Sequence, residues 1–159
     1  MLHFVLEFKD AYRILKRYIR SINTILQWVS KHGCETDLQN LKIQSYLFLC
    51  HAAFENYLEK ITTDIVENSV SDFNKNGKIN KCIVSLIVSE TIAQFDEGIS
   101  RKPIKSKIVS DLGKFVNIAK RNHIGVISGN NGIKIRDQKA LLNPVGLNSR
   151  TKCNTPDLI

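Results

Sequence analysis

The sequence is poor in the residues that mark several classes of protein. Three prolines and eight glycines in 159 residues argue against a collagen-like or linker-rich chain. The four cysteines are far apart and form no C-x-x-C pair, and the N-terminus lacks the unbroken apolar run of a secretory signal. We therefore expect free thiols in a cytoplasmic protein rather than a disulfide framework.

Long apolar runs and metal-ligand spacings are missing as well. No segment approaches the ~20 apolar residues that cross a bilayer, so we expect no membrane contact. His32 and Cys34 are close in sequence, but no second ligand pair with zinc spacing follows them. The segment Gly129 to Gly132 lacks the G-K-[ST] ending of a phosphate-binding loop. We expect neither a metal nor a cofactor.

What remains is the composition of one basic globular domain over residues 1–159. Hydrophobic residues are 43% and charged residues 24%, which excludes a disordered tail and a membrane bundle. Lys and Arg number 23 against 15 Asp and Glu, a net charge of +8. This excess favours a polyanionic partner such as nucleic acid, although a basic surface alone does not identify a function.

The first half of the sequence predicts two long antiparallel helices. Apolar residues recur at alternating steps of four and three from Phe4 to Val29, which predicts an amphipathic helix over residues 4–32 with Gly33 as its C-cap. A second helix opens at Thr36-Asp37-Leu38-Gln39, which fits a capping box, and its apolar stripe covers residues 43–65. Joined by a short turn, the two helices form an αα-hairpin.

The second half predicts shorter elements. We expect a turn at residues 74–77, a helix over 80–95, a break over 98–103 and a helix over 104–119. After Arg121, glycines and a proline predict loops around the apolar residues 140–142. Thr155-Pro156-Asp157 predicts the start of another helix, which suggests a domain that is incomplete at its C-terminus. The expected fold is all-α, an up-and-down bundle built on the hairpin with an irregular C-terminal segment.

The first candidate for chemistry is the basic face of the first helix. At about 100° per residue, its basic side chains project opposite the apolar stripe. These side chains are Lys9, Arg13, Lys16, Arg17, Arg20 and Lys31. Arg13, Lys16, Arg17 and Arg20 are therefore our candidate nucleic-acid-binding residues. The alternative is that they form the solvated side of an amphipathic helix.

The second candidate is the pair His51 and Glu55 on the second helix. Their i, i+4 spacing places the two side chains within reach of each other, and a carboxylate can orient an imidazole for acid–base catalysis. The alternative is a hydrogen bond that satisfies two polar groups at the edge of a packed bundle.

Two stretches resemble a known family. The first is residues 46–61, with the sequence Tyr46-Leu-Phe-Leu-Cys-His-Ala-Ala-Phe-Glu-Asn-Tyr-Leu-Glu-Lys-Ile61. The second is residues 128–147, of the form s-G-n-x-G-i-k…k-x-L-l-x-P-x-G. Both resemble the RiboL-PSP-HEPN family of the HEPN superfamily. The second stretch is the more specific, because it fixes glycines, leucines and a proline in order over twenty residues.

This resemblance implies an all-α fold and an association with RNA. Many HEPN proteins are metal-independent endoribonucleases or RNA-binding modules, often dimeric and linked to toxin–antitoxin or defence systems. Catalytic members carry an R-x4–6-H motif, but none of the four histidines here has an arginine at that spacing. In the family pattern the motif would follow Pro144-Val145-Gly146, in the helix that Thr155 begins. Glu55 resembles the acidic position that supports catalysis.

Three hypotheses follow for the function. In the first, the chain is part of a HEPN ribonuclease or RNA-binding protein and ends before the catalytic helix. In the second, it is a complete non-catalytic module or antitoxin-like partner that binds RNA, a second copy or another helical protein through the hairpin. In the third, His51 and Glu55 belong to a different active site. We do not expect catalysis from this chain in either of the first two cases.

Overall fold

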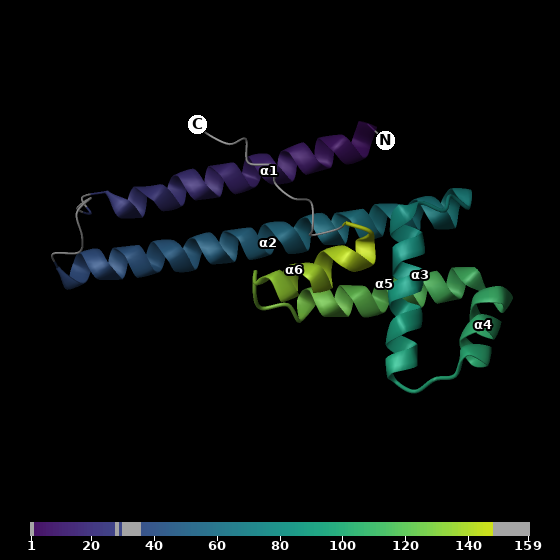
Figure 1. Ribbon diagram of the computed structural model, residues 1–159. Coiled ribbons are helices and arrows are strands. Elements are labelled where there is room, and N and C mark those ends of the chain that lie inside the picture. Colours follow the sequence, from purple (N-terminus) through teal and green to yellow (C-terminus); the bar gives the residue numbers. More distant parts are fainter. Residues whose placement is uncertain (1, 28, 30–35, 148–159) are drawn as a thin grey trace, which may run out of the picture.

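The computed structural model describes residues 2–27, 29 and 36–147. Over these ranges the protein is all-α, without a strand, which confirms the predicted fold class (Figure 1). The elements are α1 (Leu2–Asn23), η1 (Thr24–Leu26), α2 (Asp37–Asn76), α3 (Lys81–Asp96), α4 (Arg101–Ser110), α5 (Leu112–Ser128), α6 (Ile135–Leu142) and η2 (Asn143–Val145).

The 40-residue helix α2 is the spine of the molecule, about 60 Å long. Helix α1 lies antiparallel along its N-terminal part, and α3 to α6 gather around its C-terminal part (Figure 1). The predicted αα-hairpin is therefore confirmed. As predicted, the Thr36 hydroxyl caps α2 by accepting a hydrogen bond from the Gln39 N–H at 3.2 Å. Gly77, in the left-handed region at φ +65°, ends the helix.

The first helix is shorter than predicted. Helix α1 ends at Asn23 and continues as a 3₁₀ turn to Leu26, rather than running to His32. The Thr24 hydroxyl donates to the Ser21 carbonyl at 2.7 Å, a local bond that competes with helical geometry. The predicted C-cap Gly33 and the predicted helix start at Thr155 lie outside the described residues.

The helix predicted over residues 104–119 is divided in two. Helix α4 already begins at Arg101, inside the predicted break, because Pro103 lies in its first turn, where a missing N–H costs little. Asp111 then ends α4 and caps α5, since its carboxylate accepts from the Lys114 N–H at 2.9 Å. This capping bond also lowers the pKa of the Asp111 carboxyl.

The segment after Arg121 is mostly helical, which corrects the prediction of loops. Helix α5 continues through Gly125 to Ser128, because Ala119, His123 and Ile127 extend its buried stripe. Helix α6 then follows after a six-residue connection. In the sequence this periodicity is obscured by the polar His123, which is buried in the structure.

The core lies between the C-terminal part of α2 and the helices around it. Its centre is formed by Val66 and Val70 of α2, Ile83 and Leu86 of α3, Val116 and Ala119 of α5, and Val145 of η2. The hairpin contributes little to this core. Among the described side chains of residues 9–60, Leu15 alone is buried.

Candidate nucleic-acid interface

The predicted basic face lies on the outer side of α1. Arg13, Lys16, Arg17 and Arg20 are all exposed. On the other side of the helix, Leu15 is buried against α2. The helical spacing thus separates an anchoring side from a charged side, as the sequence predicts.

The four candidate residues differ in how their charges are neutralised. Arg13 forms an ion pair with Asp10 at 3.0 Å, and the Lys16 ammonium lies 4.7 Å from the centre of the Tyr12 ring. Within the described part of the chain, Arg17 and Arg20 form no ion pair or hydrogen bond. Two guanidinium groups are therefore available for a phosphate, which they match in a bidentate geometry.

The structure does not contain the predicted interaction between His51 and Glu55 of α2. His51 is exposed, and the described residues include no hydrogen bond between it and Glu55. Glu55 is half-buried, and its Oε1 is shielded from solvent without a hydrogen-bond partner among the described residues. Neither the catalytic nor the simple hydrogen-bonded arrangement is present, and a role for this pair stays a prediction.

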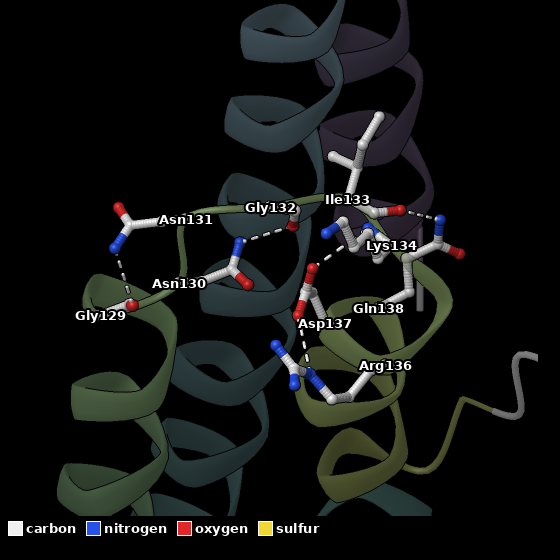
Figure 2. Close-up of polar contacts among 9 residues, drawn as sticks. All are labelled: Gly129, Asn130, Asn131, Gly132, Ile133, Lys134, Arg136, Asp137 and Gln138. Carbon is white, nitrogen blue, oxygen red and sulfur yellow. Dashed lines mark hydrogen bonds and ion pairs between the residues drawn. The ribbon is translucent and has the colours of Figure 1, made fainter.

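Residues 129–134 form the glycine-containing segment between α5 and α6, and their hydrogen bonds position α6 (Figure 2). The Asn130 amide donates to the Gly132 carbonyl at 3.1 Å and to Glu59 Oε1 of α2 at 3.3 Å. The Lys134 N–H donates to Asp137 Oδ2 at 3.1 Å, which caps α6. The glycine-containing segment thus has a structural role, because it holds the start of α6 against α2.

Gly132 leaves space for the cap of α6. A Cβ at this position would lie 2.5 Å from Asp137 Oδ2. We expect Gly132→Ala to displace the carboxylate and to cost about 1 kcal/mol in urea unfolding, the usual loss for a helix cap. Gly125→Ala is the control, because a Cβ there meets nothing within 4 Å and the position is helical. It should be stabilising by about 0.5–1 kcal/mol, so a loss of equal size in both variants would contradict the role of Gly132.

Sequence reasoning missed a polar cluster around the buried carboxylate of Glu90, between α3 and α5. The Asn122 amide donates to both carboxylate oxygens of Glu90, at 3.0 and 3.1 Å, and the Gln94 amide donates to Glu90 Oε1 at 2.8 Å. Glu90 and Gln94 are buried. The three amide contacts compensate the carboxylate for lost water and fix the two helices against each other. The i, i+4 spacing of Glu90 and Gln94 was the available signal.

The described residues contain neither a metal-ligand cluster nor a membrane-spanning helix. Within the described ranges, His, Cys, Asp and Glu do not gather in any group of three or more that could hold a metal ion. No helix in the described part of the chain is both long and apolar enough to span a membrane. The described cysteines, Cys50 and Cys82, are free.

The fold, together with the glycine-containing segment packed against α2, defines an all-α domain built on a long helical hairpin. The family model RiboL-PSP-HEPN matches residues 6–157, which is nearly the whole chain. This protein therefore belongs to the RiboL-PSP-HEPN family, and the resemblance noted in its sequence is confirmed. Comparison with curated proteins and with solved structures gave no match.

Proposed function

We propose that this chain is an RNA-associated HEPN domain that contacts the RNA backbone through the basic face of α1. The observation that carries this proposal is the pair of exposed guanidinium groups, Arg17 and Arg20, without partners among the described residues. The net charge of +8 and membership of a HEPN family support it. We further propose a cytoplasmic location and a role in a toxin–antitoxin or defence system, on the strength of the family alone.

The chemistry of this surface favours phosphate contacts over base recognition. Arginine donors bind phosphate oxygens and release counterions from the nucleic acid, so the affinity falls as salt rises. The described side chains of α1 include only two aromatic ones, Tyr12 and Tyr18. Stacking of unpaired bases therefore contributes little to the proposed interface.

We propose that this chain binds RNA without cutting it. No histidine in the sequence has an arginine at the spacing of the R-x4–6-H motif. The remaining candidates, His51 and Glu55, are not hydrogen-bonded to each other. If the wild-type chain cleaves RNA and both His51→Ala and Glu55→Ala lose this activity, this part of the proposal is contradicted. That result would support an unrecognised active site at these two residues.

A double substitution on α1 tests the binding surface. We expect Arg17→Gln combined with Arg20→Gln to weaken RNA binding about tenfold or more, because hydrogen bonds to charged groups contribute about 1.5–3 kcal/mol each. The measurement is a titration of fluorescently labelled single-stranded RNA.

The matched control removes the same charge elsewhere. Lys102 and Lys105 of α4 are exposed and without ion pairs in the described structure, and α4 lies on the other side of α2 from α1 (Figure 1). We expect Lys102→Gln with Lys105→Gln to change the affinity much less. Equal losses in the two double variants would show that net charge, not the α1 surface, determines binding.

A second candidate function is a protein-interaction module, favoured by the exposed apolar residues of the hairpin. Nine large apolar side chains in the described parts of α1 and α2 are exposed: Tyr12, Ile14, Tyr18, Leu38, Leu41, Leu47, Phe48, Leu49 and Phe54. Contiguous apolar surface on a small protein commonly marks an interface with another protein. Another helical protein or a second copy of the chain would cover such a surface, as expected if the chain is itself an antitoxin-like partner.

A further inference from the structure

Helices α1 and α2 form a groove between them. It has a volume of about 240 Å³, and most of the side chains that line it are apolar or aromatic. The space exists because a small residue stands on each wall, Ala11 on α1 and Ala53 on α2, where a bulkier side chain would fill it. Pockets for drug-sized ligands measure ~300–1,000 Å³, so this groove suits a smaller molecule.

The two ends of the groove differ in chemistry. Because α1 and α2 are antiparallel (Figure 1), Asp10 of α1 lies at the same end as Asp64 of α2. Tyr18 of α1 lies at the opposite end with Ala53 of α2, about 12 Å farther along the helix axis. A ligand that matches both ends has a cationic group at one end and an apolar body at the other.

Asp64 is the carboxylate better placed to hold a cationic group. Its side chain is 22% exposed, whereas that of Asp10 is 61% exposed and pairs with Arg13. The Lys60 ammonium lies 2.7 Å from Asp64 Oδ1, so this end of the groove already accommodates an ammonium group. Asp64 Oδ2 has no hydrogen-bond partner in the described structure. A ligand ammonium group can therefore bind beside the Lys60 side chain or displace it.

Tyr57 adds a neutral aromatic surface to the groove. It is half-buried, and burial, with a smaller contribution from Tyr12, raises the pKa of its phenol. The ring therefore carries no charge at neutral pH. An aromatic face attracts a cationic group within about 6 Å, and its apolar area covers a hydrocarbon chain equally well. Both properties favour an amphipathic cation over an anion.

We propose that this groove binds a small amphipathic amine, whose ammonium group pairs with Asp64 and whose apolar body lies over Ala53 toward Tyr18. The inference goes beyond the proposed function, because the ligand is not RNA. Arg17 and Arg20, the described residues proposed to bind RNA, are outside the lining of the groove. Each proposal can therefore fail without the other.

Three ligands of equal length test the class of molecule: phenylbutylamine, phenylbutanol and phenylbutyrate. We expect the amine to shift the amide NMR signals of residues 10–18 and 53–64 in the ¹⁵N-labelled full chain. It should bind about tenfold more tightly than the alcohol, because it adds a hydrogen bond between charged groups. Phenylbutyrate should bind most weakly. Equal affinities for the amine and the alcohol, or no shifts with the amine, would overturn the proposal.

Filling the groove tests its location. Ala53→Leu should weaken binding of phenylbutylamine about tenfold or more, because the added side chain occupies the space of the ligand's apolar body. Ala52→Leu is the matched control, since Ala52 is the neighbouring residue but is exposed and outside the lining of the groove. It should leave the affinity unchanged. Binding that survives Ala53→Leu would place the ligand elsewhere and contradict the proposal.

Two charge variants test the carboxylate in opposite directions. Asp64→Asn should weaken binding of the amine about tenfold and leave that of the alcohol unchanged. Lys60→Met removes the competing ammonium group and should tighten binding of the amine about twofold. If Asp64→Asn still prefers the amine to the alcohol, Asp64 does not hold the ammonium group and the proposal is wrong. The NMR spectrum of each variant without ligand separates a loss of fold from a loss of binding.

Discussion

Replacing Gly146 with alanine should lower the free energy of unfolding by about 3 kcal/mol. Gly146 follows η2 at φ +79°, a left-handed conformation that costs other residues about 1–2 kcal/mol. An added Cβ would also lie 2.9 Å from Ser85 Oγ and 3.0 Å from Lys81 Cγ, both on α3. Overpacking of this kind costs about 1–3 kcal/mol. Because Val145 is buried beside it, displacement of Gly146 would disturb the core.

Gly77→Ala separates the two contributions to this cost. Gly77 also has a positive φ, +65°, but a Cβ there would meet nothing within 4 Å. It should therefore lose only the backbone part, about 1–2 kcal/mol. Urea unfolding of the two variants provides the comparison. Equal losses would show that close packing of η2 on α3 contributes nothing at Gly146.

Acidification should destabilise the protein through His123. Its ring, on α5, is buried, with Nε2 lacking a hydrogen-bond partner among the described residues. Burial lowers the pKa of His123 to about 4 despite an opposing hydrogen bond with the Leu141 backbone of α6. The unfolded chain binds a proton near pH 6.5, whereas the folded chain stays neutral until about pH 4. Stability is therefore lost as the pH falls through this window, by about 3 kcal/mol in total.

Urea unfolding across this pH window measures the effect, and two histidine variants control it. His123→Leu should flatten the dependence of stability on pH, even though it alters stability at neutral pH. His51→Ala removes an exposed histidine and should leave the dependence unchanged. If His123→Leu retains the steep loss between pH 6.5 and 4, another group is responsible.

The hairpin was predictable because its signals are local. The spacing of apolar residues in α1 and the Thr36 cap of α2 each follow from a few neighbouring residues. The continuation of α5 was not found, because its stripe includes the polar His123, whose burial depends on packing against α6.

Some features of the candidate site could likewise be predicted from the sequence, and others could not. The exposed side of α1 follows from helical periodicity, so the positions of Arg17 and Arg20 could be predicted. The pairing of Arg13 with Asp10 depends on side-chain rotamers. Spacing alone suggested a contact between His51 and Glu55 that the structure does not contain. The Glu90–Asn122 contact joins residues 32 positions apart, which no local pattern indicates.

The salt dependence of RNA binding tests the central claim most directly. The slope of log affinity against log salt concentration reports the number of phosphates neutralised, about 0.7 per contact for single-stranded nucleic acid. If Arg17 and Arg20 each neutralise a phosphate, their combined replacement by glutamine should reduce the magnitude of the slope by about 1.4. A wild-type slope near zero, or an identical slope in the double variant, would contradict RNA binding through α1.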